Sequence, residues 1–131
     1  MINALAHVCF TVKDLDASVA FYQGTLGLGH AFDFINDEGE RFGVYLKLGG
    51  RTFLELFKGE PSDGAGSFQH LCLEVADIHA AVADLRAAGI EVTDAVLGCD
   101  HSWQAWLSDP DGNRIELHAY TSESWQAPHL A

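Results

Sequence analysis

The chain has 131 residues, of which 48% are hydrophobic, and this is enough for one ordinary folded domain. Seven Lys and Arg against 19 Asp and Glu give a net charge of −12. Because phosphate groups and anionic lipids are bound by clustered positive charge, this balance argues against nucleic acid or a membrane as a partner and leaves small molecules.

The expected compartment is the cytoplasm. The first residues, MINALAHVCFTV, lack the basic segment and the cleavage pattern of a secretion signal, and no stretch has the roughly 18 consecutive apolar residues of a membrane helix. The three cysteines are Cys9, Cys72 and Cys99. Their odd number and wide spacing are typical of reduced thiols.

The first half of the chain predicts a strand, a helix and three further strands. Apolar and polar residues alternate over His7–Val12, as in a half-buried strand. Asp14 stands at the N-cap of a helix that carries Leu15, Val19 and Tyr22 at helical spacing. Strand-like runs follow at residues 28–34, 41–48 and 52–58, with a Gly-Gly turn before the last of them.

The second half repeats this order. HVCFTVKDLDASVAFY from His7 matches HLCLEVADIHAAVADL from His70, and FLEL at 53–56 matches RIEL at 114–117. Asp77 is the expected helix N-cap, Gly89 the helix end, and Asp111 and Gly112 the turn before the last strand. The expected strands are 70–75, 91–97, 102–107 and 113–120.

A repeat of this kind predicts two similar modules. They cover about residues 1–58 and 68–120, joined by the turn-rich linker 59–67 and followed by a tail at 121–131. Each module has the order strand–helix–strand–strand–strand, so the expected class is α+β with two tandem βαβββ modules.

Strand alternation puts one His and one Glu of each module on the face opposite its aliphatic row. If the first and last strands are neighbours, His7 meets Glu55 and His70 meets Glu116, and pairing the modules face to face brings all four together. Two imidazoles and two carboxylates suit a divalent ion. Coordination would also relieve the cost, several kcal/mol, of burying a carboxylate such as Glu55 among Phe and Leu.

The same phasing predicts a substrate pocket. Its expected members are Phe53, Phe57, Tyr45, Trp106 and Arg114. The aromatic residues would form the walls for a partly apolar substrate, and Arg114 would hold an anion. Cys9 and Cys72 are interpreted as small residues near the metal, and His118 as a weaker candidate for substrate contact.

The segments SVAFY, FLELF, QHLCLEV and DPDGNRIEL resemble the vicinal oxygen chelate superfamily, which includes glyoxalase I, extradiol dioxygenases and fosfomycin resistance proteins. The resemblance covers nearly the whole chain and implies a curved mixed sheet around a U-shaped, metal-binding cleft. The family's ligand positions fall on His7, Glu55, His70 and Glu116, as in glyoxalase I. Its epimerase branch typically has Gln in place of Glu55.

This resemblance implies a lyase or isomerase of the glyoxalase I (lactoylglutathione lyase) type that uses Ni²⁺, Zn²⁺, Co²⁺, Mn²⁺ or Fe²⁺. The ion would stabilise the enediolate formed when the carbon next to a carbonyl loses a proton, with Glu55 or Glu116 as the base. Thr11 and Gly59 replace the Arg and Asn with which bacterial glyoxalase I typically contacts glutathione, so they disfavour glutathione.

Two other functions stay open. An Fe(II) dioxygenase would use His7, His70 and Glu116, but Glu55 would fill a position that an open iron site needs. A metal-free binding protein of the bleomycin-resistance type would not need the four metal-ligand residues, so their presence disfavours it. Because short bacterial-type members commonly share sites between chains, the resemblance also implies a homodimer.

Overall fold

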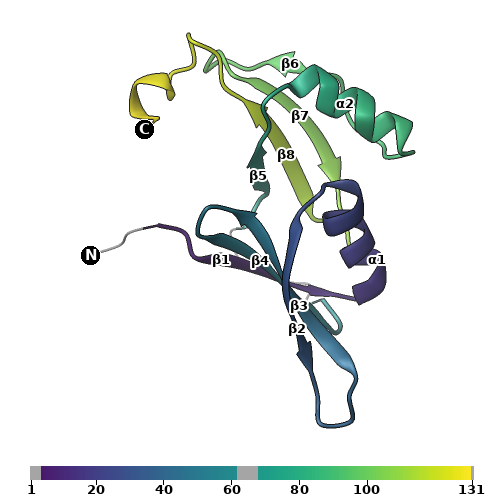
Figure 1. Cartoon of the computed structure of the whole chain (residues 1–131). Coiled ribbons are helices and arrows are strands. Elements are labelled where there is room, and N and C mark those ends of the chain that lie inside the picture. The colour runs from purple at the N-terminus through teal and green to yellow at the C-terminus, as the bar shows by residue number, and fades with distance from the viewer. Residues whose placement is uncertain (1–3, 62–67, 131) are drawn as a thin grey trace. The chain divides into compact units, whose positions relative to one another are not determined.

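The computed structural model describes residues 4–61 and 68–130 (Figure 1). By its contacts the chain divides into two compact units, Met1–Gly66 and Ser67–Ala131. From residue 62 onward, the predicted linker lies outside the described residues. Each unit holds one four-stranded mixed sheet, which confirms the α+β class and the repeated order of elements.

The first unit pairs its first strand with its last. The strands β1 (His7–Val12), β4 (Thr52–Lys58), β3 (Arg41–Gly49) and β2 (Gly29–Ile35) lie in that order. β1 runs parallel to β4, and the other pairs are antiparallel. The site prediction depends on this neighbourhood of β1 and β4.

The helical segment of the first unit differs from the regular helix expected. Asp14 caps α1 (Leu15–Val19) by accepting the N–H of Ala17 at 3.0 Å. The chain then widens into a π-helical segment, Ala20–Thr25, in which the N–H of Leu26 donates to the oxygen of Phe21 five residues earlier. Because Phe21 is buried here and Gly24 and Thr25 are poor helix formers, packing rather than propensity sets this winding.

The second unit has the same topology. Its strands β5 (Leu71–Glu74), β8 (Arg114–Ala119), β7 (Trp103–Ser108) and β6 (Val96–Leu97) lie in that order, with β5 parallel to β8. Asp77 caps α2 (Ile78–Ala87) by accepting the N–H of Ala80 at 3.0 Å. The short 3₁₀ turn Ala127–His129 follows.

β6 is shorter than the strand predicted at residues 91–97. The cause is Thr93, which forms hydrogen bonds to the neighbouring strand with both its backbone and its side chain. Its N–H donates to the oxygen of Trp106 at 3.0 Å, while its hydroxyl oxygen accepts the N–H of Trp106 at 2.9 Å. A hydroxyl thus takes the place of a backbone carbonyl, and the regular ladder is confined to Val96 and Leu97.

Each helix covers the aliphatic face of its own sheet. α1 packs on β3 and β4, and α2 packs on β7 and β8. The aliphatic rows beneath them are buried: Val44, Leu46, Leu54 and Leu56 in the first unit, and Leu107, Ile115 and Leu117 in the second. Alternation therefore puts the His and Glu positions on the opposite face of each sheet, away from the helix. Among the described residues, no helix has the length and apolarity needed to span a membrane.

Candidate metal centre

In the first module, His7 and Glu55 meet across the parallel pair of strands. His7 Nε2 lies 3.8 Å from Glu55 Oε1. The hydroxyl of Tyr45, directly opposite Glu55 in β3, is hydrogen bonded to His7 Nδ1 at 3.1 Å. This contact orients the imidazole and leaves Nε2 facing the carboxylate. Metal-binding histidines are commonly oriented in this way, by a hydrogen bond to the ring nitrogen that does not bind the metal.

In the second module, His70 and Glu116 form the equivalent pair and lie closer together. His70 Nε2 is 3.2 Å from Glu116 Oε2. His70 Nδ1 lies 2.7 Å from the amide oxygen of Gln69 and is therefore the nitrogen that donates. In the neutral imidazole, Nε2 then turns a lone pair toward a carboxylate oxygen, and two acceptors at this distance require a proton or a cation between them.

The spacing of the two pairs can be compared with the spacing of metal ligands. Ligand atoms about 2.1 Å from one ion are about 3.0 Å apart in an octahedral shell and about 3.4 Å in a tetrahedral one. The His70–Glu116 distance lies within this range, and the His7–Glu55 distance is slightly longer. The exposed fractions of the Glu55 and Glu116 side chains are only 16% and 12%, so a nearby positive charge would stabilise each carboxylate.

The two cysteines do more than fill space. Cys9 lies opposite Glu55 and Cys72 opposite Glu116 in the parallel ladders. Burial, followed by the hydrogen bond and charge of Glu55, raises the pKa of the Cys9 thiol to about 11. Burial, followed by the charge and hydrogen bond of Glu116, raises the pKa of Cys72 to about 12. Without a bound cation, both thiols are protonated at neutral pH and donate to the carboxylates.

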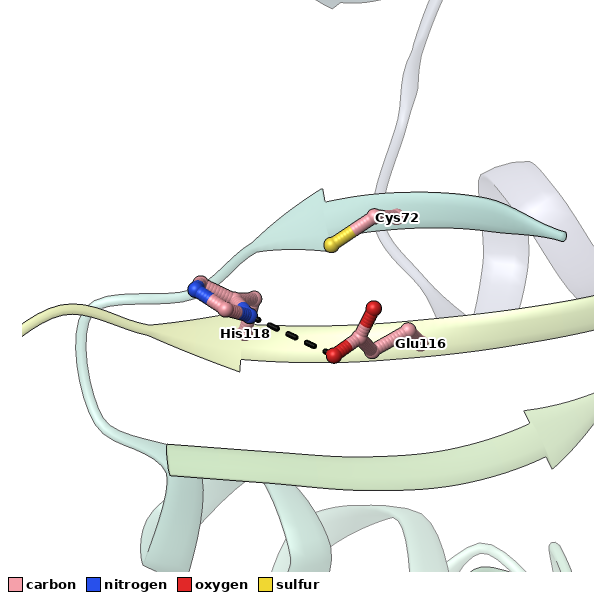
Figure 2. A group of neighbouring side chains, drawn as sticks. All are labelled: Cys72, Glu116 and His118. Atoms are coloured by element: carbon pink, nitrogen blue, oxygen red, sulfur yellow. Dashed lines mark hydrogen bonds and ion pairs between the residues drawn. The ribbon is translucent and has the colours of Figure 1, made fainter. Parts of the chain in front are cut away.

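His118 lies against Glu116 more closely than the sequence analysis indicated. Its Nδ1 is 3.4 Å from Glu116 Oε1, and its side chain is only 12% exposed. Cys72, Glu116 and His118 gather on one face of β5 and β8 (Figure 2). Strand alternation alone places His118 on the same side as Glu116, so the signal was present in the sequence.

The face of the first module that carries Tyr45 is aromatic. Tyr45 stacks with Phe53 at 5.0 Å between ring centroids and with Phe32 at 4.8 Å. Phe57 packs against Phe34 at 4.9 Å. The contributions of Phe32 and Phe34 were missed from the sequence, although Asp33 stands between them on β2 and alternation puts both rings on one face of the strand.

The second module carries a cation at the equivalent place. The guanidinium carbon of Arg114 lies 4.4 Å from the centroid of the Trp106 ring, and that ring meets His70 edge-on at 4.8 Å. The predicted substrate contacts thus lie beside the His–Glu pairs, with aromatic rings in module one and an arginine on a tryptophan in module two.

Thr11 and Gly59, the positions that disfavour glutathione, are in contact with each other. A Cβ atom on residue 59 would lie 3.0 Å from the Thr11 methyl group. The N–H of Gly59 also donates to the oxygen of Val12 at 2.9 Å. A larger residue at position 59 would therefore have to displace Thr11.

Comparison with known proteins gives a consistent family. The model of the Glyoxalase/Bleomycin resistance protein/Dioxygenase superfamily matches residues 4–117. The ethylmalonyl-CoA/methylmalonyl-CoA epimerase of Cereibacter sphaeroides is 38% identical over 104 residues, covering 70% of this chain and 75% of the relative. A 2-epi-5-epi-valiolone epimerase of an Actinomyces species is 30% identical over 144 residues, covering 87% of this chain and 78% of the relative.

Among solved structures, TnmS3, an antibiotic-binding protein from Streptomyces sp. CB03234, superimposes with a TM-score of 0.76. It is 29% identical, and the match covers 92% of this chain and 98% of TnmS3. The family match over most of the chain, the repeated topology and the repeated His–Glu pair agree. This protein belongs to the Glyoxalase/Bleomycin resistance protein/Dioxygenase superfamily.

Proposed function

We propose that this protein is a divalent-metal-dependent enzyme that removes and returns a proton at a carbon next to a carbonyl group, as an isomerase or epimerase related to glyoxalase I. The observation that carries the proposal is the His–Glu pair found at equivalent positions of both modules, His7 with Glu55 and His70 with Glu116. The relatives named as epimerases support the reaction class, because inversion next to a carbonyl requires removal of a proton.

The proposed ligand set is His7, Glu55, His70 and Glu116, one pair from each module, around one ion. Neutral imidazoles and carboxylates suit Ni²⁺, Zn²⁺, Co²⁺, Mn²⁺ or Fe²⁺. When bound, such an ion would stabilise the negative charge that develops on the carbonyl oxygen of the substrate.

Glu55 and Glu116 are the proposed acid–base pair. Inversion at carbon needs one group to take the proton on one side and another to return it on the other, and two carboxylates from two modules can divide this work. Each lies beside a thiol hydrogen-bond donor and a histidine, which hold it in place. Their low exposure keeps water from competing for the proton.

The neighbouring side chains favour a partly apolar substrate that carries an anionic group. The stacked rings of Phe32, Tyr45 and Phe53 offer an apolar wall. Arg114 offers a cation fixed on Trp106. Glutathione is disfavoured because Thr11 and Gly59 stand where bacterial glyoxalase I typically has an Arg and an Asn, so acyl thioesters and other thiol adducts are the first substrates to test.

The test is deuterium incorporation from D₂O. Methylmalonyl-CoA and adducts of methylglyoxal with several thiols are incubated with protein loaded with each of the five ions, and the products are analysed by mass spectrometry. We expect metal-dependent exchange that a chelator abolishes. Purified protein with no stoichiometric metal, and with a melting temperature that a chelator leaves unchanged, would overturn the proposal. Iron content with oxygen uptake on catechols would instead favour a dioxygenase.

A second candidate is a metal-free binding protein for a flat ligand. It is favoured by the stacked aromatic face of the first module and by the likeness to TnmS3. A chelator distinguishes the two functions, since binding of a planar aromatic ligand, measured by isothermal titration calorimetry, would survive metal removal only in the binding protein.

We also propose a homodimer, because each module keeps the face that bears its His–Glu pair free of its own helix. Sedimentation equilibrium should give twice the chain mass of 14.2 kDa. A monomer at micromolar concentration would contradict this.

A further inference from the structure

We propose that the second module holds a metal site of its own, made by Cys72, Glu116 and His118 and suited to a thiophilic divalent ion such as Zn²⁺ or Co²⁺. One ligand atom from each of these residues lies within 4.8 Å of the others. Cys72 comes from β5, and Glu116 and His118 come from the adjacent strand β8 (Figure 2). All three donors therefore belong to one sheet face of one module.

The distance between His118 and Glu116 fits coordination better than a direct hydrogen bond. An N–H···O bond is typically about 2.9 Å long, whereas His118 Nδ1 and Glu116 Oε1 are 3.4 Å apart. Two ligands of a tetrahedral zinc ion stand about 3.4 Å apart, and a sulfur and a nitrogen ligand about 3.5 Å. A side-chain rotation that moves the Cys72 sulfur by about one ångström would bring it into the same coordination shell.

Glu116 turns its two oxygens in different directions. Oε2 faces His70, which belongs to the proposed His–Glu site, and Oε1 faces His118. One carboxylate can therefore take part in both sites, with one oxygen for each. Carboxylates commonly bind metals through either or both oxygens, so the two sites are chemically compatible at Glu116.

The charge around the trio is negative. A second carboxylate residue, Glu74, lies opposite His118 in the parallel ladder, and the ring of Tyr120 packs on His118 at 4.9 Å between ring centroids. A cation would be attracted to this region and would take the place of the Cys72 proton, which is released to solvent when the sulfur binds. Sulfur, nitrogen and oxygen donors together are a typical set for zinc.

At the equivalent positions the first module lacks this set of three donors, and so it provides an internal control. Cys9 lies opposite Glu55 as Cys72 lies opposite Glu116. Two residues after the Glu, however, the first module has Phe57, whereas the second has His118. Only the second module thus combines a thiol, a carboxylate and an imidazole at these positions.

The experiment is a titration of the full chain with Co²⁺, followed by the thiolate-to-cobalt charge-transfer band in the near ultraviolet. We expect the band in the wild type and its displacement by Zn²⁺. Cys72→Ser and His118→Phe, the second of which copies module one, should each lose the band. Cys9→Ser should keep it. Melting temperatures of the metal-free variants show whether each remains folded, and His118→Gln is a milder replacement if His118→Phe does not fold.

No band in the wild type, or a band retained in Cys72→Ser and in either His118 variant, would overturn the proposal. This site shares Glu116 with the His–Glu site of the proposed function, so the His7→Gln variant is used to distinguish the two sites. That variant should lose deuterium exchange on substrate yet keep the charge-transfer band. A band lost in His7→Gln would assign the sulfur to a single shared site and contradict a site confined to the second module.

Discussion

The two modules have the same strand order and the same His–Cys–Glu framework, yet they surround their carboxylates differently. Glu55 lies among rings, with Tyr45 opposite it and Phe57 two residues later. Glu116 lies near Trp106, which carries Arg114, and has His118 against its second oxygen. The comparison indicates that the repeat supplies a common frame of His, Cys and Glu. The side chains around that frame give one module an apolar role and the other a polar one.

The largest expected effect comes from replacing the carboxylate that occupies the equivalent position in each module. Glu55→Gln and Glu116→Gln should each lower the rate of deuterium exchange about 100-fold or more, the usual contribution of a general acid or base. Glu116→Gln should also remove the cobalt–thiolate band, whereas Glu55→Gln should leave that band in place. Exchange kinetics and absorption spectra measured on the same samples check both. Undiminished exchange in Glu55→Gln would remove that residue from the mechanism.

The next effect concerns the aromatic face of module one. A Cβ atom on residue 43 would lie 2.6 Å from a ring carbon of Phe57 and 2.9 Å from one of Phe34. We expect Gly43→Ala to cost about 1–3 kcal/mol of the free energy of unfolding, because the rings must move. Urea unfolding measures this cost. Gly24→Ala is the matched control, since nothing lies within 4 Å of its Cβ position, and an equal loss there would contradict the ring clash.

The helix caps allow a direct test of how alike the modules are. Asp14 and Asp77 each accept the N–H of the residue three positions later at 3.0 Å. Replacing either with Ala should cost about 1 kcal/mol, and replacing it with Asn much less. Equal losses of thermal stability are expected, because the cap bond is the same in both modules. A loss confined to Asp77→Ala would show that the short α1 is held by packing alone.

The smallest effect is a pH dependence found in module one. The hydrogen bond from His30, at 2.8 Å, and the charges of His30 and Arg41 lower the pKa of Asp33. A carboxyl with a lowered pKa in the folded state stabilises that state above its ordinary pKa, and this stabilisation is lost as the pH falls through the lowered value. Asp33→Asn should therefore reduce the melting temperature slightly at neutral pH and leave it unchanged in strong acid. The same loss at both pH values would contradict the assignment.

Much of the fold could be predicted from the sequence. The repeat, the Asp14 and Asp77 caps and most strand positions follow from local pattern and turn chemistry, and all are confirmed. The shortened β6 and the π-helical segment could not be predicted. Each depends on a contact with a distant segment, the Thr93 hydroxyl on Trp106 in one case and the burial of Phe21 in the other.

The site could be predicted in part. Alternation on each strand correctly placed His7 with Glu55 and His70 with Glu116 once the parallel pairing was known. That these pairs share one ion stays a prediction. The closeness of His118 to Glu116 could not be predicted, because the distance depends on rotamers, which sequence spacing does not specify.

The parallel pairing of β1 with β4 has a consequence for folding kinetics. It joins the first strand of the module to the last, with His7 opposite Phe53, so this contact closes a loop that contains every other element of the module. Such long-range closure is among the slower steps in forming a small domain. His7 and Glu55 therefore meet only when the loop has closed, and the proposed metal site can form only after the ribosome has synthesised the last strand of each module.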